Sequence, residues 1–339
     1  MIIISDFIPI IVNRYNTMRI IFKASLCACI LFISLLSTVV VHAVKPPIKI
    51  AAIFAQTGID SLDNKSYIEG AKLTVNEINR QGGLLDRQLE LIIIDNQSTP
   101  KGSEEAAKKA VKLNVSVVIG AAWSSHSLPI ALILQKSKIP MITPISNDPE
   151  VTKTGDYIFR VCFDDEYQSK VLADFAYNEL KARTSVILKN IEEVYSVTLS
   201  RFLKKSFLKN NGEVLWNDVY NNMAADFSHI LREVQEYTPD IVFVPGYARD
   251  SGLLIKQAGK MGIKTIFLGG DGWDDQDIED YGGKYLEGSY YATHWHWDIP
   301  SAANLRFKKI YQKKYGMNAK SRNFLLLWFM TLLDYLLTR

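Results

Sequence analysis

The 339-residue chain is long enough for two domains of ordinary size, and its composition, 48% hydrophobic and 22% charged, is that of a globular protein. Its formal net charge is only +3, with both signs interspersed and no basic stripe. This balance excludes the usual signature of a nucleic-acid-binding protein, so we expect no nucleic acid partner.

The N-terminal segment has the pattern of an export signal. Arg19 and Lys23 precede an uncharged apolar run over residues 24–43, and this run ends in Val41-His42-Ala43, which fits a small-residue cleavage site. We therefore predict a signal peptide over residues 1–43, cleaved near Ala43, and a mature protein that is exported across the cytoplasmic membrane.

Two alternatives for this segment stay open. An uncharged run of about 20 residues is also long enough to anchor the chain in a bilayer. Residues 1–17 fit no part of a signal peptide, so translation could start at Met18 instead of Met1.

After Pro47, strand patterns alternate with helical ones. Short apolar runs predict strands, and apolar residues three and four apart predict one face of a helix. The first half predicts, in chain order, a strand at 48–55, a helix at 67–81, a strand at 89–95, a helix from Thr99-Pro100, and strands at 115–120 and 139–143. The second half predicts strands at 185–189, 240–244 and 265–268, with helices near 196–209, 226–237 and 250–261.

Apolar strands that alternate with amphipathic helices predict parallel sheets covered on both faces. Because the series occurs twice, we predict an α/β protein of two doubly wound parallel-sheet lobes joined by hinge strands. Lobe 1 would comprise residues 44–165 and 295–322, and lobe 2 residues 166–294.

Small polar residues follow several of the predicted strands, in the segments 120–125, 143–147, 245–247 and 269–273. In open parallel sheets, ligands bind at these carboxyl ends, where helix N-termini present free N–H groups. Serine hydroxyls at a helix start suit a carboxylate, an acid such as Asp271 suits an ammonium, and Trp123, Tyr247 and Trp273 can cover an apolar body. The combination predicts a zwitterionic amino acid as ligand, although each residue could also serve as an ordinary cap or turn.

Enzymatic motifs are missing. The first predicted strand is not followed by a Gly-x-Gly-x-x-Gly fingerprint, and neither a P-loop nor a Gly-x-Ser-x-Gly motif occurs. His294-Trp295-His296-Trp297 could place two histidines on one strand face, as metal ligands can lie, but no third ligand is apparent. We therefore interpret this stretch as a strand between the lobes and predict no catalytic residue, no cofactor and no metal.

Several fragments resemble the periplasmic solute-binding proteins of branched-chain amino acid ABC transporters, over about residues 48–315. These fragments are Gly70-Ala71, Glu77-Ile78-Asn79-Arg80-Gln81-Gly82-Gly83, Met141-Ile142-Thr143-Pro144, Phe159-Arg160-Val161-Cys162-Phe163 and Gly269-Gly270-Asp271-Gly272. The resemblance implies a type I binding-protein fold without catalysis. It also implies an amino acid or related amide as ligand, a membrane permease as partner, and a monomer that closes over its ligand.

The resemblance also assigns roles to single residues. Ser124 would bind the ligand carboxylate, the Ile145 carbonyl and Asp271 would bind the ammonium, and Tyr247 would cover the ligand. Asn147 stands where relatives have Thr. The remaining candidates are Trp123, Asp63 and Tyr195.

Besides Asn147, three of these candidates depart from the family pattern. Asp63 stands where relatives often place an aromatic residue, which makes the pocket more polar and argues against leucine-like specificity. Asp271 is one methylene shorter than the usual Glu, and Tyr195 lacks the Gly that follows it in relatives.

From Asn323 the chain is rich in apolar residues, which are not confined to one face of a helix. Relatives instead continue with an Ala-Leu-x-x-Tyr-Asp-Ala helix. Our hypothesis is a frameshift near residue 323, which makes 323–339 an aberrant apolar tail. Two alternative functions also stay open: a ligand-sensing ectodomain of the same fold without a transport role, and a small-molecule enzyme of doubly wound α/β fold.

Overall fold

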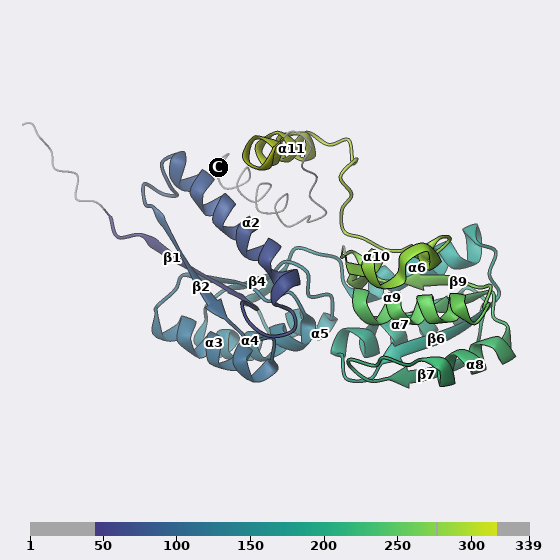
Figure 1. Cartoon of the computed structure of the whole chain (residues 1–339). Coiled ribbons are helices and arrows are strands. Elements are labelled where there is room, and N and C mark those ends of the chain that lie inside the picture. Colours follow the sequence, from purple (N-terminus) through teal and green to yellow (C-terminus); the bar gives the residue numbers. More distant parts are fainter. Residues whose placement is uncertain (1–44, 276, 317–339) are drawn as a thin grey trace, which may run out of the picture. The chain divides into compact units, whose positions relative to one another are not determined.

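The computed structural model describes residues 45–275 and 277–316 (Figure 1). The predicted signal peptide and the predicted apolar tail lie outside these residues. The described residues from Pro46 onward belong to one compact unit. None of the helices in the described ranges combines the length and the hydropathy that a membrane crossing requires.

The first half is built on a five-stranded sheet whose strands, all parallel, follow the order β2-β1-β3-β4-β5. The strands are β1 (Ile48–Phe54), β2 (Leu89–Asp95), β3 (Val117–Gly120), β4 (Met141–Thr143) and β5 (Ile158–Arg160). The connecting helices are α2 (Ser61–Arg80), α3 (Pro100–Lys112), α4 (Ser124–Ser137) and α5 (Pro149–Lys153).

The second half repeats this arrangement, with the parallel order β10-β9-β8-β6-β7. Its strands are β6 (Thr184–Asn190), β7 (Glu213–Tyr220), β8 (Ile241–Phe243), β9 (Ile266–Gly269) and β10 (Tyr290–Tyr291). Its α-helices are α6 (Asp165–Asp174), α7 (Val194–Lys209), α8 (Ser228–Tyr237), α9 (Ala248–Lys260) and α10 (Asp277–Gly282). Three shorter turns accompany them: the π-helical turn η2 (Phe175–Glu179) and the 3₁₀ turns η3 (Asp271–Trp273) and η4 (Gly283–Leu286). A last helix, α11 (Ala302–Tyr315), follows.

Alternate residues of β1 enter two separate cores, as the period of a strand requires. Ala51 and Ile53 pack with residues of α3 and α4, whereas Ala52 and Phe54 pack with residues of α2 and with Phe307 of α11. The fully buried Phe307 thus attaches the last described helix to the first sheet, although the two are far apart in sequence.

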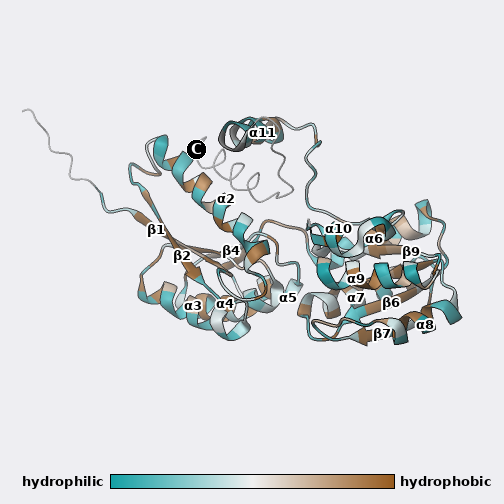
Figure 2. Cartoon of the chain, viewed as in Figure 1, coloured by the Kyte–Doolittle hydropathy of each residue, from teal (hydrophilic) through white to brown (hydrophobic). Residues whose placement is uncertain are grey.

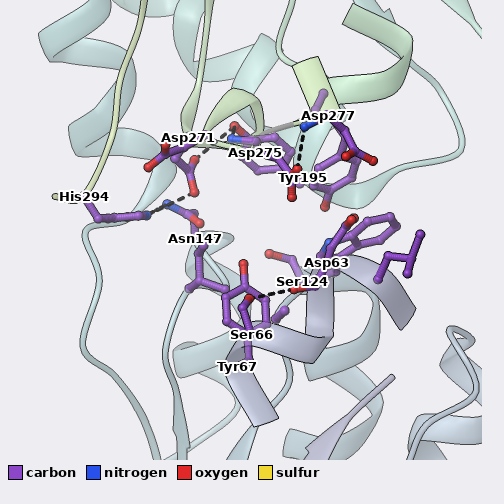
Figure 3. A pocket seen from close by; sticks show the side chains of 18 of the residues that line it. Asp63, Ser66, Tyr67, Ser124, Asn147, Tyr195, Asp271, Asp275, Asp277 and His294 are labelled. Carbon is purple, nitrogen blue, oxygen red and sulfur yellow. Dashed lines mark hydrogen bonds and ion pairs between the residues drawn. The ribbon is translucent and has the colours of Figure 1, made fainter. Parts of the chain in front are cut away.

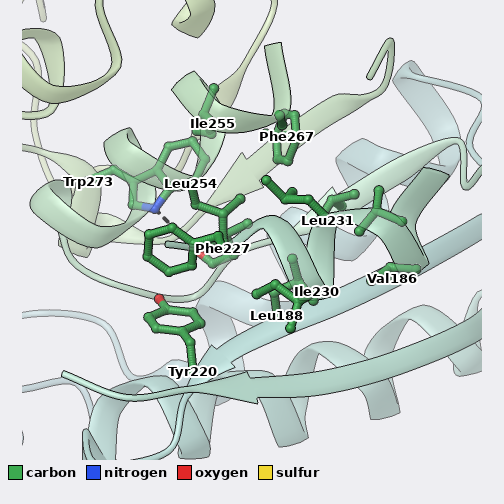
Figure 4. Packing of buried hydrophobic residues seen from close by; sticks show 14 of the residues in the cluster. Val186, Leu188, Tyr220, Phe227, Ile230, Leu231, Leu254, Ile255, Phe267 and Trp273 are labelled. Carbon is green, nitrogen blue, oxygen red and sulfur yellow. Dashed lines mark hydrogen bonds between the residues drawn. The ribbon is translucent and has the colours of Figure 1, made fainter. Parts of the chain in front are cut away.

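The second sheet is also covered on both faces. Val186 and Leu188 of β6 belong to one core with residues of α8 and α9 (Figure 4), and Ile187 between them belongs to another with residues of α6 and α7. Figure 2 shows that hydrophobic residues concentrate on the strands, while the helices also carry hydrophilic residues.

The prediction of two doubly wound parallel-sheet lobes is confirmed. The exact lobe boundaries given above stay a prediction. The interpretation of residues 294–297 as a strand is wrong, because β10 ends at Tyr291, the chain bends at His294 and a turn follows at residues 297–298. The reason is local: the Thr293 hydroxyl oxygen accepts the Trp295 N–H at 3.3 Å, which bends the chain away from the extended form.

Candidate ligand-binding site

A cavity of about 600 Å³ lies at the carboxyl ends of strands from both sheets. Eight of the residues that the sequence singles out line it: Asp63, Trp123, Ser124, Ile145, Asn147, Tyr195, Tyr247 and Asp271. Figure 3 labels five of them, namely Asp63, Ser124, Asn147, Tyr195 and Asp271. The lining also includes Leu62, Ser66, Tyr67, Ala122, Ala248, Gly272, Asp274, Asp275, Asp277, His294 and Tyr311.

One wall is formed by the start of α4. Ser124 is the first residue of this 14-residue helix and is 2% exposed. Its hydroxyl oxygen accepts the Asp148 N–H at 3.2 Å, which leaves the hydroxyl hydrogen to be donated elsewhere. The free N–H groups and the dipole of a helix N-terminus favour a negative group at this wall.

The loop that leads into α4 is held in place by close packing and hydrogen bonds. Gly120 has a φ of +126°, and a Cβ there would lie 2.1 Å from the Ile53 carbonyl oxygen, so only glycine fits. The Thr143 hydroxyl donates to the Ala121 carbonyl at 2.8 Å, which ties this loop to the end of β4. Gly120 and Thr143 therefore position the loop, and with it Ser124 at the start of α4.

Asn147 is positioned by Arg160 of β5. The Arg160 Nη1 atom donates to the carbonyl oxygens of Ser146, Asn147 and Asp148 at 3.2, 3.0 and 2.9 Å. The Asn147 amide in turn donates to the Phe163 carbonyl at 3.3 Å. One guanidinium thus organises the loop that brings Ile145 and Asn147 to the cavity.

Asp271 faces the cavity from η3, directly after β9. Its Oδ1 atom accepts from Gln168 Nε2 at 2.5 Å and from the Tyr195 hydroxyl at 3.0 Å. Its Oδ2 atom lies 3.0 Å from His294 Nε2. The predicted ammonium anchor therefore already has three protein partners.

Aromatic rings cover another part of the cavity. Trp123 stacks on Tyr247 with ring centroids 4.1 Å apart and an angle of 11° between the planes, and the Tyr195 ring centroid lies 5.3 Å from that of Tyr247. The expectation for Trp273 is wrong. This ring is 1% exposed in the core of the second sheet, where its indole N–H donates to the Val244 carbonyl at 3.0 Å.

His294 is a lining residue that the sequence pattern did not single out as a ligand contact. Its side chain is 3% exposed, and its ring centroid lies 3.8 Å from that of Phe163. His296, by contrast, points to solvent and lies near Asp298. The alternating histidines were visible in the sequence, but their directions depend on the turn after β10, which the pattern did not reveal.

The cavity is acidic. Five of the lining residues are aspartates and one is a histidine, and none of the lining residues within the described ranges is Lys or Arg. The nearest oxygens of Asp63, Asp275 and Asp277 lie within 4.8 Å of one another. Burial, followed by the charges of Asp275 and Asp277, raises the pKa of Asp63 to about 7.

Three carboxylates at this spacing have the oxygen chemistry that hard cations prefer. Acidic groups are also common without an ion, so we assign no metal to them. Their charges create a negative field across this end of the cavity, where Figure 3 shows Asp63 and Asp277 on the side away from His294.

Comparisons with known proteins agree with this architecture. Residues 47–331 match the family described as periplasmic binding protein. A leucine binding protein from Thermotoga maritima is 32% identical, with a TM-score of 0.79 over 85% of this chain and 81% of that one.

Two further relatives are similar. A branched-chain amino acid transporter substrate binding protein from Streptococcus pneumoniae, solved in complex with isoleucine, is 25% identical with a TM-score of 0.78 over 85% of this chain and 83% of that one. The Leu/Ile/Val-binding protein of Escherichia coli (strain K12) is 28% identical over 247 residues, which cover 73% of this chain and 67% of that protein.

These matches extend over both sheets and confirm the resemblance that the sequence fragments indicate. The family consists of substrate-binding proteins rather than enzymes. The chain therefore belongs to the periplasmic binding protein family, together with the leucine-binding and branched-chain amino acid-binding proteins that it resembles.

Proposed function

We propose that this protein captures an α-amino acid outside the cytoplasmic membrane and delivers it to the permease of an ABC transporter. It acts as a monomer, without catalysis and without a cofactor. The names of the relatives, which refer to leucine, isoleucine and valine, support an amino acid ligand. The apolar run before Ala43 supports export of the mature chain to the periplasm.

One observation carries the proposal: a single cavity has a wall that suits an anion and a wall that suits a cation. The N-terminus of α4 with Ser124 suits the α-carboxylate, and Asp271 suits the α-ammonium. Ile145 and Asn147 also line the cavity, where the Ile145 carbonyl and the Asn147 side chain would accept from the ammonium, and the Trp123–Tyr247 stack borders the cavity with apolar area.

The same electrostatics restrict the side chain of the ligand. Asp63, Asp275 and Asp277 repel a second carboxylate, because charges in a partly buried cavity are screened less than at the surface. We therefore expect neutral or basic amino acids to bind and glutamate and aspartate to be rejected. Asp63 also disfavours a purely aliphatic side chain at its end of the cavity.

A thermal-shift screen of the full chain against the twenty standard amino acids tests the proposal. A ligand that binds only the folded state must raise the melting temperature. We expect Asp271→Ala to weaken binding of the best amino acid at least about tenfold, because it removes the carboxylate that neutralises the ammonium.

The matched control is Asp298→Ala, which removes an exposed carboxylate outside the lining residues and should leave the shift unchanged. An unchanged shift in Asp271→Ala would show that the ammonium binds elsewhere. Absence of any shift with the wild-type chain would reject the amino acid as ligand. Loss of uptake of the identified amino acid in a deletion strain would separate transport from sensing.

A further inference from the structure

In the described chain, His294 contacts Asp271 Oδ2, the carboxylate oxygen that would accept from a ligand ammonium. Its Nε2 lies 3.0 Å from Asp271 Oδ2, and the two side chains are 3% and 4% exposed. An ionised carboxylate only accepts hydrogen bonds, so Nε2 carries the hydrogen in this contact. Figure 3 shows His294, Asn147 and Asp271 together at one end of the cavity.

His294 is fixed in this position by contacts on several sides. Its ring lies against Phe163. On either side in sequence, the Thr293 hydroxyl donates to Asp274, and the buried Trp295 packs against Phe307 with ring centroids 5.7 Å apart. Because the segment is already ordered, the contact with Asp271 requires little further loss of conformational entropy.

The remaining capacity of Asp271 is small. A carboxylate offers about four lone-pair positions. Gln168 and Tyr195 use two at Oδ1, and His294 uses one at Oδ2. A ligand ammonium at Oδ2 would bring its N–H donors against the N–H of His294, so the two donors compete for one oxygen.

We propose that His294 is a specificity-determining residue, which competes with the ligand's α-ammonium for Asp271 and so lowers the preference of the site for ammonium-bearing ligands. The inference rests on the proposed function. A site whose buried acceptor is unpaired until the ligand arrives discriminates strongly against analogues that lack the donor. Here Asp271 is already hydrogen-bonded to His294 before the ligand arrives. The binding free energy therefore gains only the difference between the bond of Asp271 to the ammonium and its bond to His294.

The proposal predicts an effect of unusual sign: removal of a side chain that lines the site should tighten binding. His294→Phe keeps a ring against Phe163 but removes the donor to Asp271. His294→Gln keeps an N–H donor. His296→Phe is the matched control, because His296 lies two residues away and is exposed.

The experiment is titration calorimetry of the full chain. The probes are the amino acid with the largest thermal shift and the carboxylic acid that has the same side chain without the ammonium. We expect His294→Phe to bind the amino acid at least about tenfold more tightly than wild type, and the plain acid no more tightly. His296→Phe should stay within about threefold of wild type for both probes. His294→Gln keeps a donor to the charged group, so it should gain less affinity for the amino acid than His294→Phe.

A second measurement tests the competition in the wild-type chain itself. In the wild-type chain, labelled with ¹⁵N-histidine, saturation with the amino acid should shift the Nε2 resonance of His294 as its bond to Asp271 breaks, and leave that of His296 in place. Resonances are assigned from the spectra of His294→Gln and His296→Phe.

The outcomes separate the two ideas. Weaker amino acid binding by His294→Phe, or an unmoved Nε2 resonance, overturns the competition while the proposed function stands. A gain that is equal for both probes also overturns it. If no amino acid binds the wild type or any variant, the proposed function is rejected and this inference with it.

Discussion

Asp60 is a buried carboxylic acid at the start of α2. It is 1% exposed. His126 Nδ1 lies 3.8 Å from it, at the distance of an ion pair. However, burial raises the pKa of Asp60 to about 8 and lowers the pKa of His126 to about 4, so both groups are neutral near pH 7.

This environment makes stability depend on pH. Between about pH 4 and pH 8 folded Asp60 keeps a proton that the unfolded chain has lost, so the free energy of unfolding falls as the pH rises through this window. We expect Asp60→Asn to remove the part of the fall that Asp60 causes, while Asp63 continues to contribute, and to stabilise the protein at pH 8 by a few kcal/mol. Urea unfolding at pH 5 and pH 8 measures this.

Glu90→Gln, on the exposed side of β2, is the control for this prediction, and it should follow the wild-type profile. A profile for Asp60→Asn that equals that of wild type would show that Asp60 does not hold the proton.

At the scale of elements, the close approach of β1 and the loop before α4 positions the site. A Cβ on Gly120 would lie 2.1 Å from the Ile53 carbonyl oxygen, whereas a Cβ on Gly82 would meet nothing within 4 Å, although both residues have positive φ. We expect Gly120→Ala to cost about 3 kcal/mol or more, since backbone must move, and Gly82→Ala only about 1 kcal/mol from backbone strain. Chemical denaturation of both variants compares the costs, and equal costs would show that the loop before α4 adapts freely.

The elements were also the part that sequence periodicity predicted best. The buried strands β2 and β6 appear within one residue of their predicted bounds, because continuous apolar runs identify a strand covered on both faces. Helix α2 begins at Ser61, six residues before the predicted start, because its first two turns carry polar residues, of which Asp63 and Ser66 line the cavity. Strands β5, β7 and β10 escaped prediction. β5 and β10 have only three and two residues, and β7 has polar residues among its apolar ones.

For the candidate site, prediction succeeded where chain topology alone determines position. Ser124, Asn147, Tyr247 and Asp271 each follow a strand, and parallel strands bring such positions to one edge. His294 follows the same rule, but its direction depends on the turn that Thr293 makes. The roles of these residues toward a ligand stay a proposal.

At the scale of the whole molecule, charge is distributed unevenly. The chain has a net charge of only +3, yet five aspartates line one cavity. A field concentrated in a cavity attracts cationic solutes without making the surface as a whole acidic. The fold supports this concentration, because two similar sheets each contribute strand ends to the same space.

The contact between Trp123 and Tyr247 gives the protein an intrinsic optical probe. Trp123 belongs to the first sheet's strand-end loop and Tyr247 to the second's, and their rings overlap almost face to face. Any hinge rotation that opens the cavity must separate the two rings and expose the indole to water. We expect a red shift and a change in intensity of tryptophan emission when ligand is removed, and loss of most of that change in Trp123→Phe. An unchanged spectrum on ligand removal would mean that the rings stay together, and that solutes enter and leave without any such rotation.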